Sequence, residues 1–202
     1  MKTATHNILT LTVAMLTVMV FAGLISGCRG EQDEEAAARA EVKKATEKLT
    51  ARAKVLISEK KYASAASEIE SFLKKYPDAP GSASLWASKI VCHRKDGDMT
   101  GALLTSADMT EKFANKGRAL CDAGEVLMAN GCLPDAASMF ELASGDPAVR
   151  ERACYGVAMS NYRLGRFAKA MQYIDIAAAL SPDDPKVMAA VKKIEDARFV
   201  NE

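Results

Sequence analysis

Histidine, aromatic residues and excess charge are all scarce in this chain of 202 residues. There are two histidines, aromatic residues make up 6% of the total, and 27 basic side chains face 26 acidic ones. Balanced charge supplies no net field to attract nucleic acid or an acidic surface. We therefore expect no nucleic-acid partner.

Motifs for catalysis and metal binding are lacking as well. The sequence contains no nucleophile elbow, phosphate-binding loop or zinc-protease motif. His93 adjoins Cys92, but adjacent helical residues diverge by about 100°, and no second pair is spaced for tetrahedral ligation. We expect no metal, no cofactor, no small-molecule substrate and no enzymatic activity, and a hydrolase ranks last among the functional alternatives.

The start of the chain has the pattern of a secretory leader. Lys2 precedes an uncharged apolar run at residues 8–25, and the next charge is Arg29. The end of the run, Leu24-Ile25-Ser26-Gly27-Cys28, resembles a bacterial lipobox, which implies cleavage after Gly27 and acylation of Cys28, palmitate included. Residues 1–27 would then be a lipoprotein signal peptide. The alternative is an uncleaved signal anchor, because 18 apolar residues just reach the length needed to span a bilayer.

Residues 28–45 comprise the lipidated cysteine, a short polar linker and the start of a first long helix. Two or three acyl chains anchor a protein stably, whereas one holds only marginally. Arg29 stands where an aspartate would resemble the inner-membrane retention signal of enteric bacteria. We expect a bacterial envelope protein that is lipid-anchored in the outer membrane and faces the periplasm.

Two consecutive blocks of 34 residues, 117–150 and 151–184, repeat one another. Superimposing them pairs Gly131 with Gly165 and Ala136 with Ala170. The phase extends backwards to residues 83–116, with Gly97 and Ala102 at the same two positions. Across an inserted Pro80-Gly81-Ser82 it reaches a degenerate unit at residues 46–79. A last helix at residues 185–198 would cap the array.

This period, with a glycine in mid-unit and a proline near the end, resembles the tetratricopeptide family over residues 46–198. The resemblance implies an all-α superhelical array of about four helical hairpins, whose first helices line a concave groove. The unit at residues 83–116 departs from the family pattern at Lys89 and Ser106, where a large apolar residue is usual. The lysine and asparagine set with which some relatives clamp a C-terminal carboxylate is not matched.

The first-helix faces supply the candidate groove residues. The candidates are Arg94, Lys95, Arg118, Met128, Arg152, Tyr155, Met159, Tyr162 and Arg163. Amphipathic rings and adaptable thioethers suit a peptide or a partner subunit. The alternative is that Tyr155 and Tyr162 simply cover the neighbouring helix or the cap.

Four cysteines besides Cys28 fall at positions where relatives carry small or apolar residues: Cys92, Cys121, Cys132 and Cys154. Two alternatives stay open for an oxidising compartment. The thiols are free and buried, or disulfides form, with Cys121 to Cys154 the favoured pair because both lie in the first turns of adjacent helices.

The leader, acylated cysteine, tether and repeats together predict a lipid-anchored periplasmic scaffold that binds a peptide or partner subunit in an envelope assembly. Tetratricopeptide lipoproteins of the outer-membrane barrel-assembly and type IV pilus machineries are similar in layout. The alternative is an accessory subunit of a barrel-assembly, pilus or secretion machinery that positions an enzyme or other components.

Overall fold

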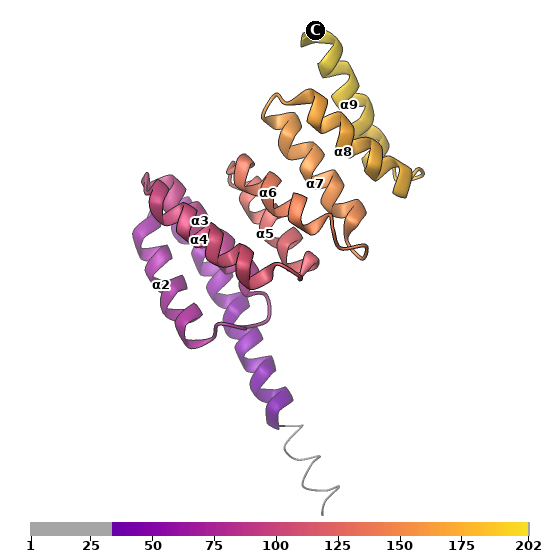
Figure 1. Cartoon of the computed structure of the whole chain (residues 1–202). Coiled ribbons are helices and arrows are strands. Elements are labelled where there is room, and N and C mark those ends of the chain that lie inside the picture. Colours follow the sequence, from indigo (N-terminus) through magenta and orange to yellow (C-terminus); the bar gives the residue numbers. More distant parts are fainter. Residues whose placement is uncertain (1–33, 202) are drawn as a thin grey trace, which may run out of the picture. The chain divides into compact units, whose positions relative to one another are not determined.

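The computed structural model describes residues 34–201, and these contain helices and no strand. Residues 34–58 are helical. The later helices carry the labels of Figure 1: α2 (Tyr62–Lys75), α3 (Ser82–Asp96), α4 (Met99–Phe113), α5 (Gly117–Ala129), α6 (Leu133–Ala143), α7 (Arg150–Arg163), α8 (Phe167–Leu180) and α9 (Pro185–Asn201). The predicted all-α class is confirmed.

The described residues belong to two units, which divide after Lys44: residues 34–44 to the first and residues 45–201 to the second. The leader and Cys28 lie outside the described residues, so lipidation stays a prediction. Within residues 34–201, no helix combines the length and the apolar character needed to cross a bilayer.

In the second unit, neighbouring helices pair as antiparallel hairpins that stack as superhelical repeats. Residues 45–58 pack on α2, α3 on α4, α5 on α6 and α7 on α8, and α9 then packs on α8. The second helix of each hairpin has a fully buried alanine at the equivalent position: Ala65, Ala102, Ala136 and Ala170 each have a relative exposure of 0%. Small side chains at these positions let the paired backbones approach, which is what the repeat phase predicts.

The turn within each hairpin uses a left-handed residue at the equivalent position. Gly97, Gly131 and Gly165 have φ of 83°, 80° and 72°, and Lys60 has φ of 61° in the first hairpin. Glycine adopts this conformation without steric cost, whereas a residue with a Cβ atom is strained in it. The backbone conformation of the turn in the first hairpin, at Lys60, is therefore the least favourable of the four.

Among consecutive helices from α2 to α9, packing is weakest between α4 and α5. These helices meet at only a few points, whereas α6 packs along α7. Ser106 is partly exposed on α4, although Phe140 is fully buried at the equivalent position of α6. Leu103 and Leu104 are consequently 61% and 62% exposed. Ser106, which departs from the family pattern, thus lies at the loosely packed junction of α4 and α5. The first two hairpins are joined to the last two mainly because α3 packs on α5.

Candidate functional site

Two adjoining cavities lie on the face formed by the first helices of successive hairpins. The N-terminal groove cavity measures about 500 Å³ and is lined by Lys54, Ile57, Ser58, Ser84, Ser88, Asp122, Glu125, Val126, Ala129 and Asn130. The C-terminal groove cavity measures about 460 Å³ and is lined by Glu125, Met128, Phe140, Glu151, Arg152, Tyr155, Gly156, Asp184 and Lys186. Because Glu125 lines both, the two cavities adjoin. Together, as what we call the groove, they extend over the first long helix, α3, α5 and α7 and reach the start of α9.

Arg152 connects two of these helices inside the groove. Its Nε donates to Oε1 of Glu125 at 2.9 Å, and its Nη2 donates to Oδ1 of Asp122 at 2.8 Å. Burial lowers the pKa of Arg152, but these hydrogen bonds and the two carboxylate charges raise it overall. The guanidinium therefore links α7 to α5, and it offsets the negative charge that Asp122 and Glu125 would otherwise present to a ligand.

The close backbone approach behind the C-terminal groove cavity depends on glycine. A Cβ atom at Gly156 would lie 2.5 Å from the ring of Phe140, and one at Gly124 would lie 2.8 Å from it. The ring of Phe140 therefore packs directly on the bare backbones of α5 and α7. This contact positions the two helices that carry Glu125 and Arg152.

The tyrosine face of α7 is covered by α9. The Lys186 Nζ lies 4.3 Å from the ring centroid of Tyr155, and the Lys193 Nζ lies 5.1 Å from that of Tyr162. Both rings and Met159 also pack against the buried cluster that includes Val187 and Ile194. These contacts correspond to the alternative in which the tyrosines cover the cap. Tyr155 nevertheless lines the C-terminal groove cavity, and burial raises the pKa of its hydroxyl.

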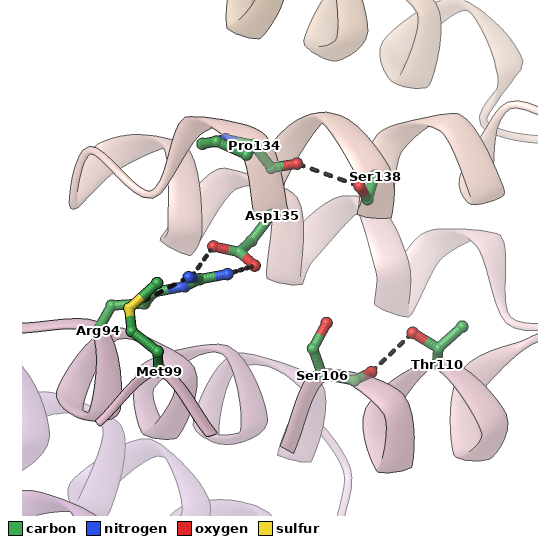
Figure 2. Close-up of polar contacts among 7 residues, drawn as sticks. All are labelled: Arg94, Met99, Ser106, Thr110, Pro134, Asp135 and Ser138. Atoms are coloured by element: carbon green, nitrogen blue, oxygen red, sulfur yellow. Dashed lines mark hydrogen bonds and ion pairs between the residues drawn. The ribbon is translucent and has the colours of Figure 1, made fainter. Parts of the chain in front are cut away.

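Arg94 is not among the residues that line the two groove cavities, and it pairs with Asp135 on α6. Figure 2 shows its guanidinium against the carboxylate of Asp135, with Nη2 2.7 Å from Oδ1 and Nε 3.0 Å from Oδ2. The hydrogen bond to Asp135 raises the pKa of Arg94. Asp135 is buried, so this bidentate pair is a strong link between α3 of the second hairpin and α6 of the third, beside the loosely packed junction of α4 and α5.

The remaining predicted residues are divided between different surfaces. Met128 lines the C-terminal groove cavity, and its carbonyl oxygen accepts a hydrogen bond from Nη1 of Arg163 at 2.9 Å. Lys95 is exposed on α3. Arg118 lines a third cavity, close to the loops between hairpins. Partner binding by any of these residues stays a prediction.

Sequence reasoning missed the part of the groove contributed by the first long helix. Lys54, Ile57 and Ser58 line the N-terminal groove cavity. They occupy the repeat positions of Val91, Arg94 and Lys95 once the three inserted residues are counted. Extending the first-helix face one unit backwards would have identified them.

The four cysteines that the structure describes, Cys92, Cys121, Cys132 and Cys154, are free and buried, so Cys121 and Cys154 are not bonded to each other. Burial raises the pKa of the Cys92 and Cys121 thiols to about 11 and also raises those of Cys132 and Cys154. Such thiols remain protonated and unreactive near neutral pH. No group of His, Cys, Asp and Glu side chains suited to a metal ion occurs in the described part of the chain.

Several solved structures resemble this one, including the following two. A tetratricopeptide repeat protein from Parabacteroides merdae ATCC 43184 is 15% identical with a TM-score of 0.45, and the match covers 77% of this chain and 61% of that chain. The pilF protein of Pseudomonas aeruginosa is 17% identical with a TM-score of 0.48, with 81% and 72% covered. No curated protein matches the chain significantly.

A family model described as tetratricopeptide repeat matches residues 50–116 and 121–185. These two ranges cover more than half of the 202 residues, and their boundary falls at the junction of α4 and α5. The chain therefore belongs to the tetratricopeptide-repeat family.

Proposed function

We propose that this protein is a lipid-anchored scaffold of the bacterial envelope, which binds a segment of a partner protein in the groove formed by its first helices. Protein–protein interaction is the general role of tetratricopeptide repeats. The observation that supports groove binding is the pair of adjoining cavities, which share Glu125. The anchor is Cys28, on the strength of the lipobox resemblance.

The dimensions of the groove suit an extended peptide. Packed helices lie about 8–10 Å apart, so the three intervals from the first long helix to α7 span roughly 24–30 Å. An extended chain covers about 3.3 Å per residue, so about seven to nine residues would fill this length. The middle of the groove has a floor of small side chains, Ser84, Ser88 and Ala129, which leaves room for the side chains of a ligand.

The two ends of the groove differ in charge. Lys54 lies at one end and makes no ion pair with another described residue. Glu151 and Asp184 line the other end, where Lys186 is the neighbouring cation. Charge complementarity therefore favours a segment that places an acidic residue near Lys54 and a basic one near Glu151.

Site-specific photocrosslinking in the cells that produce the protein tests groove binding. A photoreactive residue would replace Ser84 or Ala129 in the groove, and Ala107 or Gln172, which are exposed elsewhere, would serve as matched controls. We expect one discrete crosslinked partner from the two groove positions and none from the controls. Equal crosslinking from all four positions would contradict the proposal.

The anchor is tested separately by mass spectrometry of the membrane fraction. We expect a chain that begins at Cys28 and carries acyl groups. The Cys28→Ser variant should retain its leader and gain no acyl mass, whereas Cys132→Ser should be processed normally. Unprocessed wild-type chain in the membrane would instead indicate a spanning anchor.

A further inference from the structure

The third cavity, which we call the loop-edge cavity, measures about 410 Å³. Its walls include the first turns of two helices, with Ser82 and Ala83 from α3 and residues 117–119 from α5, preceded by Lys116. Neither the groove proposal nor the repeat pattern assigns it a role. Its polar groups are nevertheless arranged for an anion.

Ser82 carries a hydroxyl that lacks a partner. The residue is only 2% exposed and lines the cavity, and its side chain makes no hydrogen bond to the described residues. A hydroxyl removed from bulk water normally finds a partner, because leaving it unpaired costs free energy. An acceptor within the cavity would supply that partner.

The helix termini at this cavity present further donors. The backbone N–H groups of Gly117, Arg118 and Ala119 make no hydrogen bond to the described chain, and Lys116, the N-cap of α5, provides no side-chain cap. Gly81, the N-cap of α3, provides none either, but the N–H groups of Ser82 and Ser84 already donate to the carbonyl oxygens of Ala79 and Gly81, so the free donor of this turn is the N–H of Ala83. Each helix N-terminus carries about half a positive charge, so both termini favour an anion here.

The side-chain charges limit how negative the anion can be. Arg118 is exposed and makes no ion pair with the described residues, and Lys116 lies over the ring of Phe113 at 5.4 Å. Three carboxylates also line the cavity, but two are paired: Asp78 with Lys112 and Asp122 with Arg152, each at 2.8 Å.

The third carboxylate, Asp146, accepts a hydrogen bond from the N–H of Ala148 at 3.0 Å and lies beside Gly117. Because Arg152 also pairs with Glu125, its single charge does not offset both carboxylates, and the side-chain charges around the cavity are close to balance. The two helix termini then supply an excess of about one positive charge. This excess fits a monoanion better than a dianion.

We propose that the loop-edge cavity binds a single carboxylate of a partner polypeptide, held by the Ser82 hydroxyl, the N–H groups of the first turn of α5 and the Arg118 guanidinium. The site goes beyond the groove and does not depend on it. Asp122 lines both the loop-edge cavity and the N-terminal groove cavity, so a peptide that leaves the groove could place its carboxylate here.

The test is a titration of the full lipidated protein in detergent micelles, followed through the backbone amide NMR signals. The probes are N-acetylalanine, which carries an α-carboxylate, the α-amide of N-acetylaspartate, which carries only a side-chain carboxylate, and inorganic phosphate. We expect saturable shifts at Gly117, Arg118 and Ala119 with at least one of the two carboxylates. The tighter of the two then identifies a chain terminus or an acidic side chain as the source.

Ser82→Ala combined with Arg118→Gln should weaken carboxylate binding at least tenfold. The matched control is Arg150→Gln, because Arg150 is also exposed at the start of a helix but lies outside this cavity. Saturable binding that is unchanged in the double variant, shifts that never saturate, or binding of phosphate without either carboxylate would each overturn the proposal. The circular dichroism spectrum shows whether each variant is folded.

Discussion

Replacement of Lys60 by glycine should stabilise the protein. Lys60 adopts φ of 61° at the position where the three later hairpins have glycine. A residue with a Cβ atom in this conformation costs about 1–2 kcal/mol, and glycine loses about 0.5–1 kcal/mol of that gain through the greater freedom of its unfolded chain. The difference predicts a stabilisation of roughly 0.5–1 kcal/mol for Lys60→Gly.

No packing contact complicates this change, since Lys60 is exposed and makes no ion pair with a described residue. The reverse substitution, Gly131→Ala, should cost about 1 kcal/mol, because a Cβ atom there meets nothing within 4 Å and only the backbone strain matters. As a control, Lys54→Gly within a helix should also cost about 1 kcal/mol.

Urea unfolding, followed by circular dichroism, measures all three differences. Stacked repeats need not unfold in one step, so the first hairpin should also be followed by amide hydrogen exchange. If Lys60→Gly leaves the free energy of unfolding unchanged or lowers it, the strain assigned to this turn does not exist.

Three further predictions concern packing, pH and the thiols. Gly156→Ala should cost about 1–3 kcal/mol in urea unfolding by overpacking against Phe140, and the additional change Phe140→Leu should recover part of this; a neutral Gly156→Ala would contradict the packing account. Hydrogen bonds from Lys89 and Lys74 lower the pKa of Glu70 from 4.5 to about 2, so its stabilising contribution is present above pH 4.5 and is lost as the pH falls towards 2. Glu70→Gln should therefore show a smaller fall in stability over that range, and identical pH profiles would refute the pairing. The four buried thiols should react with iodoacetamide at pH 8 only on unfolding, and rapid labelling of the folded protein would disprove their burial.

The repeat phase predicted the parts of the fold that depend on local sequence. A position that requires φ above zero or a side chain no larger than alanine restricts the residue type strongly, so the glycine turns and crossing alanines were visible at fixed spacing. The same phase, shifted by the three inserted residues, places Lys60 at the first turn. Unlike a glycine, a lysine does not indicate a position with positive φ, so this strained turn was found only in the structure.

The site was less predictable because it depends on pairings between distant residues. Arg94 belongs to a first helix, yet it turns to Asp135, which is 41 residues away in sequence. Tyr155 and Tyr162 lie on the expected face, yet α9 covers that face. Helical spacing shows which residues share a face, but it does not show which other helix occupies that face.

The most direct test of groove binding measures the affinity of the crosslinked partner for two tryptophan variants. Ala129→Trp would fill the N-terminal groove cavity without changing charge, and Ala107→Trp would place the same side chain on exposed α4, outside the groove. We predict that the first variant weakens binding at least tenfold and that the second binds as the wild-type protein does. Equal affinity of the two variants would contradict the account.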